Sequence, residues 1–168
     1  MERMFSPWRA EYIRQSSGGG GGGAKACIFC AGEADMADPD SLVLGVYPKT
    51  IAILNLYPYN NGHVLVAPRR HVAELWDLSA EELRELFSLV ALGAKILRQV
   101  YHAEGLNVGM NLGRAAGAGI ADHLHAHIVP RWGGDTNFMA SVLDTRVLPE
   151  SLAETHARLA AAFGPLRP

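Results

Sequence analysis

The spacing of apolar and polar residues predicts a series of short strands interrupted by one long helix. Apolar runs, bounded by turn residues, indicate strands over Leu42–Tyr47, Thr50–Tyr57, Gly62–Ala67 and Leu106–Leu112. Proline, asparagine and glycine mark the turns between the first three strands. The pattern favours an α+β fold with a mostly antiparallel sheet.

Two helices are expected on this sheet. Ser79 and Glu82 form a capping box, and the apolar residues that follow recur at helical spacing up to a stop near Gly105. The predicted core face of this long helix comprises Leu83, Leu86, Phe87, Val90, Ala94, Leu97 and Tyr101. A C-terminal helix is predicted from about Pro149 to Phe163, because proline suits the first helical turn.

The stretch Asp122–Arg131 carries the most chemistry. His123, His125 and His127, three of the seven histidines, alternate with apolar residues in what reads as a strand. Alternate side chains of a strand share one face, at about 6.5 Å from one to the next. Three aligned imidazoles indicate a metal cluster, a histidine nucleophile with helper groups, or a mixture of both, rather than a plain polar surface.

The nucleophile interpretation has a definite chemical content. An unprotonated imidazole that attacks phosphorus forms a covalent phosphoramidate, and this divides one difficult displacement into two easier steps. A neighbouring imidazolium can protonate the leaving oxygen or stabilise charge on the phosphoryl group. The glycine-rich loop over residues 113–119, directly before the histidines, could present backbone N–H groups to phosphate oxygens.

A second cluster of chemistry lies near the N-terminus. Cys27 and Cys30 are spaced as half of a tetrahedral zinc site, which needs two more ligands from elsewhere in the chain. His71 and one histidine of the triad are the candidates. A simple buried pair or a redox pair is the alternative, although the thioredoxin-like context is missing.

Length, charge and cysteine content limit the class of protein. The 168 residues suit one domain with a sizeable core. A formal net charge of −2 argues against a protein that binds duplex nucleic acid. No apolar run suggests a membrane span or a signal peptide, so we expect a cytoplasmic protein without a membrane partner. We expect a docking arm over residues 1–15, a Ser/Gly-rich linker over 16–26 and the folded domain over 27–168.

The triad and its surroundings resemble the histidine triad (HIT) superfamily. The run from His123 to Val129 is similar to the family signature of three histidines separated by apolar residues. Asn55, the Gly62-His63 strand, the Met110-Asn111-Leu112-Gly113 segment and the set Cys27, Cys30, His71 and His123 are similar to further family features. The segments around the triad also resemble bacterial diadenosine tetraphosphate hydrolases and phosphorylases.

The resemblance implies a role for each matched position, and these residues fall into three groups. It implies that His125 is the nucleophile on the α-phosphate, that His127 contacts the phosphate or assists the leaving group, and that His63 orients the triad. The implied nucleotide-binding residues are Asn55, Asn111, Gly117, Ala118, Gly119, Ile28, Phe29, Ile53 and Leu56. The implied ligands of a structural Zn²⁺ are Cys27, Cys30, His71 and His123.

The implied function is cleavage of dinucleoside polyphosphates, such as diadenosine tetraphosphate, through a nucleotidyl-histidine intermediate in a homodimer, with Mg²⁺ accompanying the substrate. Water or phosphate would be the acceptor. The loop at Gly117-Ala118-Gly119-Ile120 lacks the glutamine of the fragile-type enzymes, and Asn111 stands where a glutamine might be expected. The alternatives are an adenosine phosphoramidase of the same fold, a nucleotide-binding module with little turnover, and a hydrolase with a catalytic zinc on the triad.

Overall fold

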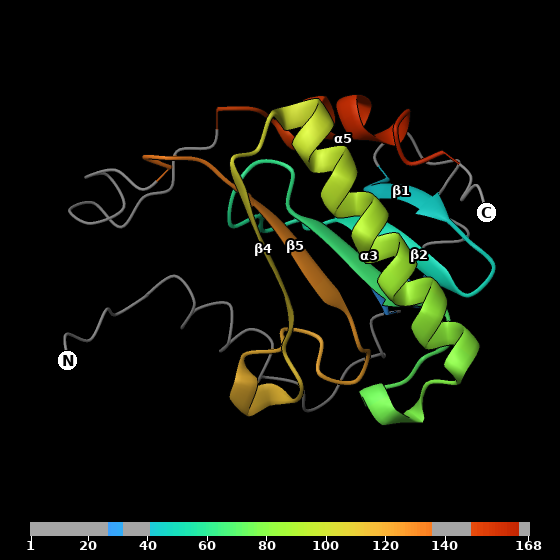
Figure 1. Cartoon of the computed structure of the whole chain (residues 1–168). Coiled ribbons are helices and arrows are strands. Elements are labelled where there is room, and N and C mark those ends of the chain that lie inside the picture. Colours follow the sequence, from blue (N-terminus) through green and yellow to red (C-terminus); the bar gives the residue numbers. More distant parts are fainter. Residues whose placement is uncertain (1–26, 32–40, 136–148, 165–168) are drawn as a thin grey trace. The chain divides into compact units, whose positions relative to one another are not determined.

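A five-stranded antiparallel sheet with a long helix across one face forms the core of the structure (Figure 1). The computed structural model describes residues 27–31, 41–135 and 149–164. The strands lie in the order β1 (Val43–Val46), β2 (Thr50–Leu54), β3 (Val64–Pro68), β5 (Ala126–Arg131) and β4 (Gly105–Met110). Each neighbouring pair is antiparallel. The predicted α+β class is confirmed.

The helices are α2 (Ile28–Ala31), α3 (Ala80–Tyr101) and α5 (Leu152–Ala160), and two short 3-10 helices, η2 (Leu75–Asp77) and η3 (Arg114–Ala116), lie between strands. Contacts group these elements into one compact unit, which in the described part of the chain comprises residues 27–31, 41–133 and 149–164. The predicted arm and linker over residues 1–26 lie outside the described residues, so the proposed division into arm, linker and domain stays a prediction. No helix in the described ranges is both long and apolar enough to span a membrane.

Both faces of the central strands are buried, by different partners. Ala52, Leu54, Val64, Val66 and Ile128 face α3 and form the larger apolar cluster with its buried side chains. Alternate residues on the opposite face, among them Ile51, Ile53 and Leu65, form a second cluster with Phe29 of α2. Because side chains alternate along a strand, His127 lies on this second face, opposite Leu65 of β3. The helix α3 therefore packs on the first face of the sheet, and His127 lies on the second face.

The long helix begins as predicted but ends earlier. Ser79 caps α3, and Glu82 completes the capping box. The helix ends at Tyr101 with His102 in the left-handed conformation (φ 50°), and Gly105 begins β4 instead of terminating the helix. Phe87 was predicted in the core face and is 51% exposed, because Leu89, Gly93 and Ile96 turn toward the sheet in its place.

Two further element boundaries differ from the prediction. β5 begins at Ala126, so His123 and His125 precede the strand and only His127 lies within it. The preceding segment leaves the sheet because the N–H of Leu124 donates to the carbonyl of Val72 (2.7 Å) instead of pairing with β3. α5 begins at Leu152, not near Pro149, because Ser151 and Glu154 form a capping box there.

Glu82 makes folding stability sensitive to acid. Its carboxylate accepts two hydrogen bonds from the guanidinium of Arg70 (2.9 Å each) and one from the N–H of Ser79 (2.8 Å). These hydrogen bonds, Arg70 first, lower the pKa of Glu82 to about 2. A carboxyl with a lowered folded-state pKa contributes stability above its ordinary value of 4.5, and this contribution is lost as pH falls from there toward 2. We expect Glu82→Gln to be less stable than wild type at pH 7 and to lose less stability between pH 5 and pH 3 in urea unfolding. Parallel stability curves for the two proteins would contradict this.

Candidate active site and metal centre

His125 is held as a buried imidazole with one nitrogen available. The residue is 5% exposed, and its Nδ1 lies 2.9 Å from the backbone carbonyl of His123. A carbonyl oxygen can only accept, so Nδ1 carries the proton and donates, and Nε2 keeps its lone pair. Burial lowers the pKa of His125, against the opposing effect of this hydrogen bond. A neutral ring with a free lone pair on Nε2 has the form that a histidine nucleophile requires.

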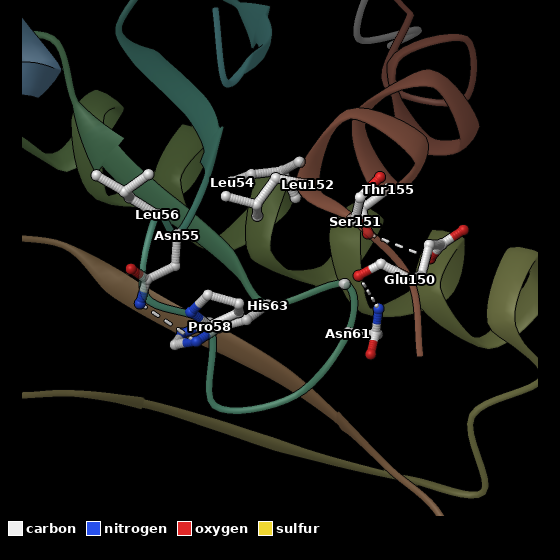
Figure 2. A pocket seen from close by; sticks show the side chains of 11 residues that line it. Leu54, Asn55, Leu56, Pro58, Asn61, His63, Glu150, Ser151, Leu152 and Thr155 are labelled. Atoms are coloured by element: carbon white, nitrogen blue, oxygen red, sulfur yellow. Dashed lines mark hydrogen bonds between the residues drawn. The ribbon is translucent and has the colours of Figure 1, made fainter. Parts of the chain in front are cut away.

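A directed chain of hydrogen bonds leads into His127. The backbone N–H of Tyr59 donates to Nδ1 of His63 (3.1 Å), and the side-chain amide of Asn55 donates to the same atom (3.2 Å; Figure 2). Because Nδ1 of His63 accepts, its Nε2 carries the proton and donates to Nδ1 of His127 (2.9 Å). A neutral His127 then bears its proton on Nε2. The backbone amide of Tyr59 thus sets the tautomers of both rings.

Aromatic contacts hold these imidazoles in place. The ring of Tyr59 stacks on His127 (6.0 Å between centroids, 15° between planes) and lies 4.6 Å from the ring of His63. His125 and His127 meet edge to face at 5.0 Å. Three histidines from the turn before β3, the segment before β5 and β5 itself are therefore assembled into one packed group.

The four predicted metal ligands lie together at the other end of this group. One ligand atom from each of Cys27, Cys30, His71 and His123 falls within 4.8 Å of all the others. Nδ1 of His123 lies 3.3 Å from Sγ of Cys27, 3.6 Å from Sγ of Cys30 and 3.2 Å from Nδ1 of His71. Tetrahedral zinc with these ligand types separates its donor atoms by about 3.3–3.8 Å. The cluster fits that ion.

The surroundings of His123 support a ligand role. Its Nε2 lies 2.7 Å from the carbonyl of Pro68, so Nε2–H donates there and Nδ1 is left with a lone pair directed at the two cysteines. Desolvation by burial lowers the pKa of His123 and favours the neutral ring that binds metals. Two thiols and two imidazoles, with no further donor in this cluster among the described residues, match the donor set of a structural zinc site.

Comparison with known proteins agrees with this geometry. The family model of the HIT domain matches residues 37–134. The chain belongs to the HIT family. It is 36% identical, over 97% of its length and 85% of the relative, to the AP-4-A phosphorylase of Mycobacterium tuberculosis. A zinc-bound histidine triad family protein from Mycobacterium smegmatis has a similar structure, with a TM-score of 0.65, 30% identity and coverage of 84% of this chain and 95% of that one.

A further relative matches a shorter part of the chain. The asymmetrical bis(5'-nucleosyl)-tetraphosphatase of Schizosaccharomyces pombe is 40% identical over 84 residues, which are 50% of this chain and 46% of the relative. Both curated relatives are enzymes, and the prediction of a HIT-family enzyme is confirmed. The HIT fold predicted from the sequence is confirmed by the solved structures.

The HIT-family nucleotide residues predicted from the sequence fall into different environments. Asn55 and Leu56 line a cavity of about 220 Å³ beside His63, which α5 closes with Ser151 and Leu152 (Figure 2). The cavity is completed by Leu54, Pro58, Asn61, Gly62, Glu150 and Thr155. Leu56 is 55% exposed, and so it presents apolar surface to a ligand.

The other predicted apolar contacts lie on and around α2. Ile28 is 45% exposed, whereas Phe29 and Ile53 are 2% and 7% exposed within the second apolar cluster. Of the four apolar residues predicted to contact the base, Ile28 and Leu56 are thus exposed, whereas Phe29 and Ile53 are buried. An exposed side chain can cover a base directly, whereas a buried one can only support the residues around it.

The predicted phosphate-contacting residues lie after β4. Asn111 directly follows β4 in the sequence and is half-buried. Gly117 has a positive φ of 93° and allows the loop to change direction. The N–H of Gly117 donates to the carbonyl of Arg114 (2.9 Å), and that of Ala118 to the carbonyl of Gly113 (3.3 Å). Those two amides are therefore used inside the loop.

Two site residues escaped the sequence analysis. Tyr59 lies in a segment read only as a turn, and its neighbours Pro58 and Asn60 gave no indication of a ring stacked on two histidines. Gly109 lies directly opposite His127 in the register of β4 and β5, and a Cβ built there would meet nothing within 4 Å. A glycine inside a strand often marks the close approach of a ligand, and this signal was present in the sequence.

Gly109 gives a direct test of access to His127. Valine suits an edge strand and meets no neighbour at its Cβ, so we expect Gly109→Val to retain the thermal stability of wild type. Its side chain would occupy the open space beside His127, and we expect the Michaelis constant for a nucleotide substrate to rise about tenfold or more. Steady-state kinetics and thermal unfolding measure the two effects. Unchanged kinetics in a folded Gly109→Val would show that substrate does not approach from this side.

Proposed function

We propose that this HIT-family enzyme cleaves dinucleoside polyphosphates, with diadenosine tetraphosphate as the preferred substrate, through a nucleotidyl intermediate on His125. The observation that carries the proposal is the neutral His125 ring, with its lone pair on Nε2, packed beside a His127 that bears its proton on Nε2. The names of the two curated relatives support the substrate class. Phosphate is proposed as the acceptor, because the phosphorylase relative matches 97% of the chain.

The reaction would proceed in two displacements. Nε2 of His125 attacks the α-phosphorus and forms a P–N bond, while the P–O bond to the β-phosphate breaks and ATP leaves. The Nε2–H of His127 donates a hydrogen bond to the departing oxygen, which leaves as an anion that Mg²⁺ can bind, and His63 holds the His127 ring through the hydrogen bond at Nδ1. An oxygen of inorganic phosphate then attacks the same phosphorus, the P–N bond breaks, and ADP is released. Water in place of phosphate would give AMP.

The binding contacts follow from the placement of the predicted residues. We propose that Ile28 and Leu56 cover the base, with Phe29 and Ile53 beneath them, and that Asn55 reaches the ribose with its carbonyl oxygen. That oxygen already accepts from the N–H of Tyr57 (3.0 Å) and has a second lone pair. The phosphates would be contacted by Asn111, by the loop Gly117-Ala118-Gly119 and by a Mg²⁺ ion brought with the substrate. The ion would neutralise part of their charge.

The metal centre would have a structural role in this enzyme. Cys27, Cys30, His71 and His123 would hold one Zn²⁺, which fastens α2 to the segments after β3 and before β5. All four positions of a tetrahedral ion are then filled by protein, and no position is left for a substrate. Catalysis is therefore assigned to His125 and His127.

A homodimer is proposed from the edge of the sheet. β4 is an outer strand in the described part of the chain, and Val108 on it is 51% exposed. An exposed edge strand can pair with a second chain through its backbone groups. Light scattering at several protein concentrations measures the mass, and a monomer at all of them would contradict the dimer.

The products of diadenosine tetraphosphate cleavage test the proposed function. The protein is incubated with substrate and Mg²⁺, with and without inorganic phosphate, and the nucleotides are resolved. ADP together with ATP, formed only when phosphate is present, supports the phosphorylase. AMP together with ATP in the absence of phosphate makes the enzyme a hydrolase. No cleavage in either condition overturns the proposed substrate class and directs attention to adenosine phosphoramidates or to binding without turnover.

A further inference from the structure

We propose that Phe29 is a positioning residue for the nucleophile, and that the metal centre acts on catalysis by holding this ring against His125. The inference rests on the proposed role of His125. In this inference Phe29 positions His125, instead of contacting the base of the nucleotide directly.

The ring of Phe29 lies between the metal centre and the catalytic group. Its centroid is 5.0 Å from that of His123, a proposed ligand, and 5.2 Å from that of His125. The planes of Phe29 and His125 are inclined by 32°, so the two rings pack against each other in a tilted contact. Phe29 is 2% exposed, so its surface is already occupied by these rings and by the second apolar cluster. It offers almost no area to a base.

His125 needs such a support. Within the described part of the chain its polar anchor is one hydrogen bond, from Nδ1 to the carbonyl of His123, and a single bond of this kind allows the imidazole to pivot about the N–H···O axis. A pivot moves Nε2, the attacking atom. The tilted ring contact with Phe29 and the edge contact with His127 at 5.0 Å restrict that motion. Errors of about 1 Å in the placement of a reacting atom can reduce the rate by about a hundredfold.

The position of Phe29 depends in turn on the metal ligands. α2 has four residues, too few to form a stable helix by itself. Cys27 and Cys30 stand on either side of Phe29, and their sulfurs lie 3.3 Å from Nδ1 of His123 and 3.3 Å from Nδ1 of His71, respectively. An ion bound by all four residues fixes both ends of α2, and thereby the ring between them. The structure thus connects the metal centre to the nucleophile through one side chain.

Phe29→Leu tests this connection, because leucine keeps an apolar side chain and removes the flat ring. We expect kcat for diadenosine tetraphosphate to fall about tenfold or more with the Michaelis constant changed less than about twofold. We also expect the His125 Nδ1 proton, followed by NMR of the imidazole groups, to exchange with water at least about tenfold faster once the covering ring is lost. Zinc content should stay at one ion per chain.

Ile51→Val is the matched control. Ile51 belongs to the same apolar cluster as Phe29 but lies on β2, which β3 separates from β5. This variant should show the kinetics and the His125 proton exchange of wild type. Removal of zinc from wild type by a chelator should accelerate exchange of the His125 proton as Phe29→Leu does, provided that circular dichroism shows the chain still folded.

Several outcomes would overturn the inference. A raised Michaelis constant with unchanged kcat in Phe29→Leu would make the residue part of the base slot. Unchanged exchange of the His125 proton in Phe29→Leu, or equal acceleration in Ile51→Val, would show that the ring does not hold the imidazole. Because the exchange measurement needs no substrate, it remains decisive even if the wild-type protein fails to cleave diadenosine tetraphosphate, a result that would overturn the proposed function alone.

Discussion

Replacement of His125 by alanine is expected to reduce kcat on diadenosine tetraphosphate by at least about 10⁴-fold, because no other group in the site can form the covalent bond to phosphorus. The neutral ring with its lone pair on Nε2 is specific to this histidine, since His123 directs Nδ1 at the metal ligands and His127 carries a proton on Nε2 in the hydrogen-bonded chain. Substrate binding should persist, because the side chains proposed to contact base, ribose and phosphates are unchanged.

The covalent intermediate can be tested independently of the rate. Wild type mixed with substrate labelled at the α-phosphate and quenched in alkali should retain label that acid releases, as expected of a phosphoramidate, and His125→Ala should retain none. His102→Asn is the control, because His102 is an exposed histidine in the left-handed conformation, which asparagine tolerates. It should behave as wild type. Residual cleavage by His125→Ala at a rate near that of wild type would remove His125 as the nucleophile.

Loss of the metal centre is expected to have the largest effect on stability. Cys27→Ala removes one of four clustered ligands, and we expect zinc content to fall from one ion per chain to near zero. The proposed ion would join α2, His71 and His123, which are distant in sequence, so its loss should cost several kcal/mol of unfolding free energy. For a chain of this size that corresponds to a fall in Tm on the order of 10 °C. Metal analysis and thermal unfolding provide the measurements.

The same experiment separates a structural from a catalytic ion. His125→Ala should retain its zinc, because His125 lies outside the ligand cluster. The main effect of Cys27→Ala should be on thermal stability. Turnover per folded molecule should fall only as far as the loosened Phe29 ring disturbs His125. Equal melting temperatures for wild type and Cys27→Ala, or loss of zinc from His125→Ala, would contradict a structural zinc held by the cysteines.

Local patterns predicted the elements of this fold well. The capping box at Ser79 and Glu82 satisfies backbone groups within four residues, so it could be recognised without any tertiary contact, and the structure contains it. Element ends were less predictable, because partners distant in sequence decide them. β5 begins only at Ala126, since Leu124 bonds to Val72, and Phe87 lies on the exposed side of α3 because sheet packing selected the other residues.

Residue types and their spacing were enough to find the chemistry of this protein: three alternating histidines, a Cys-x-x-Cys pair and a Gly-His segment identified the HIT family and the grouping of the metal residues. The tautomers of His63 and His127 became visible only in the folded chain, because a backbone N–H of Tyr59 enforces them. The tertiary structure likewise shows that a Cβ at Gly109 would meet no described atom within 4 Å and that the rings of Phe29 and His125 pack against each other. The physical reason is that residue type and spacing reveal periodicity and local capping, whereas ring orientation and proton position depend on atoms contributed by segments far apart in the chain.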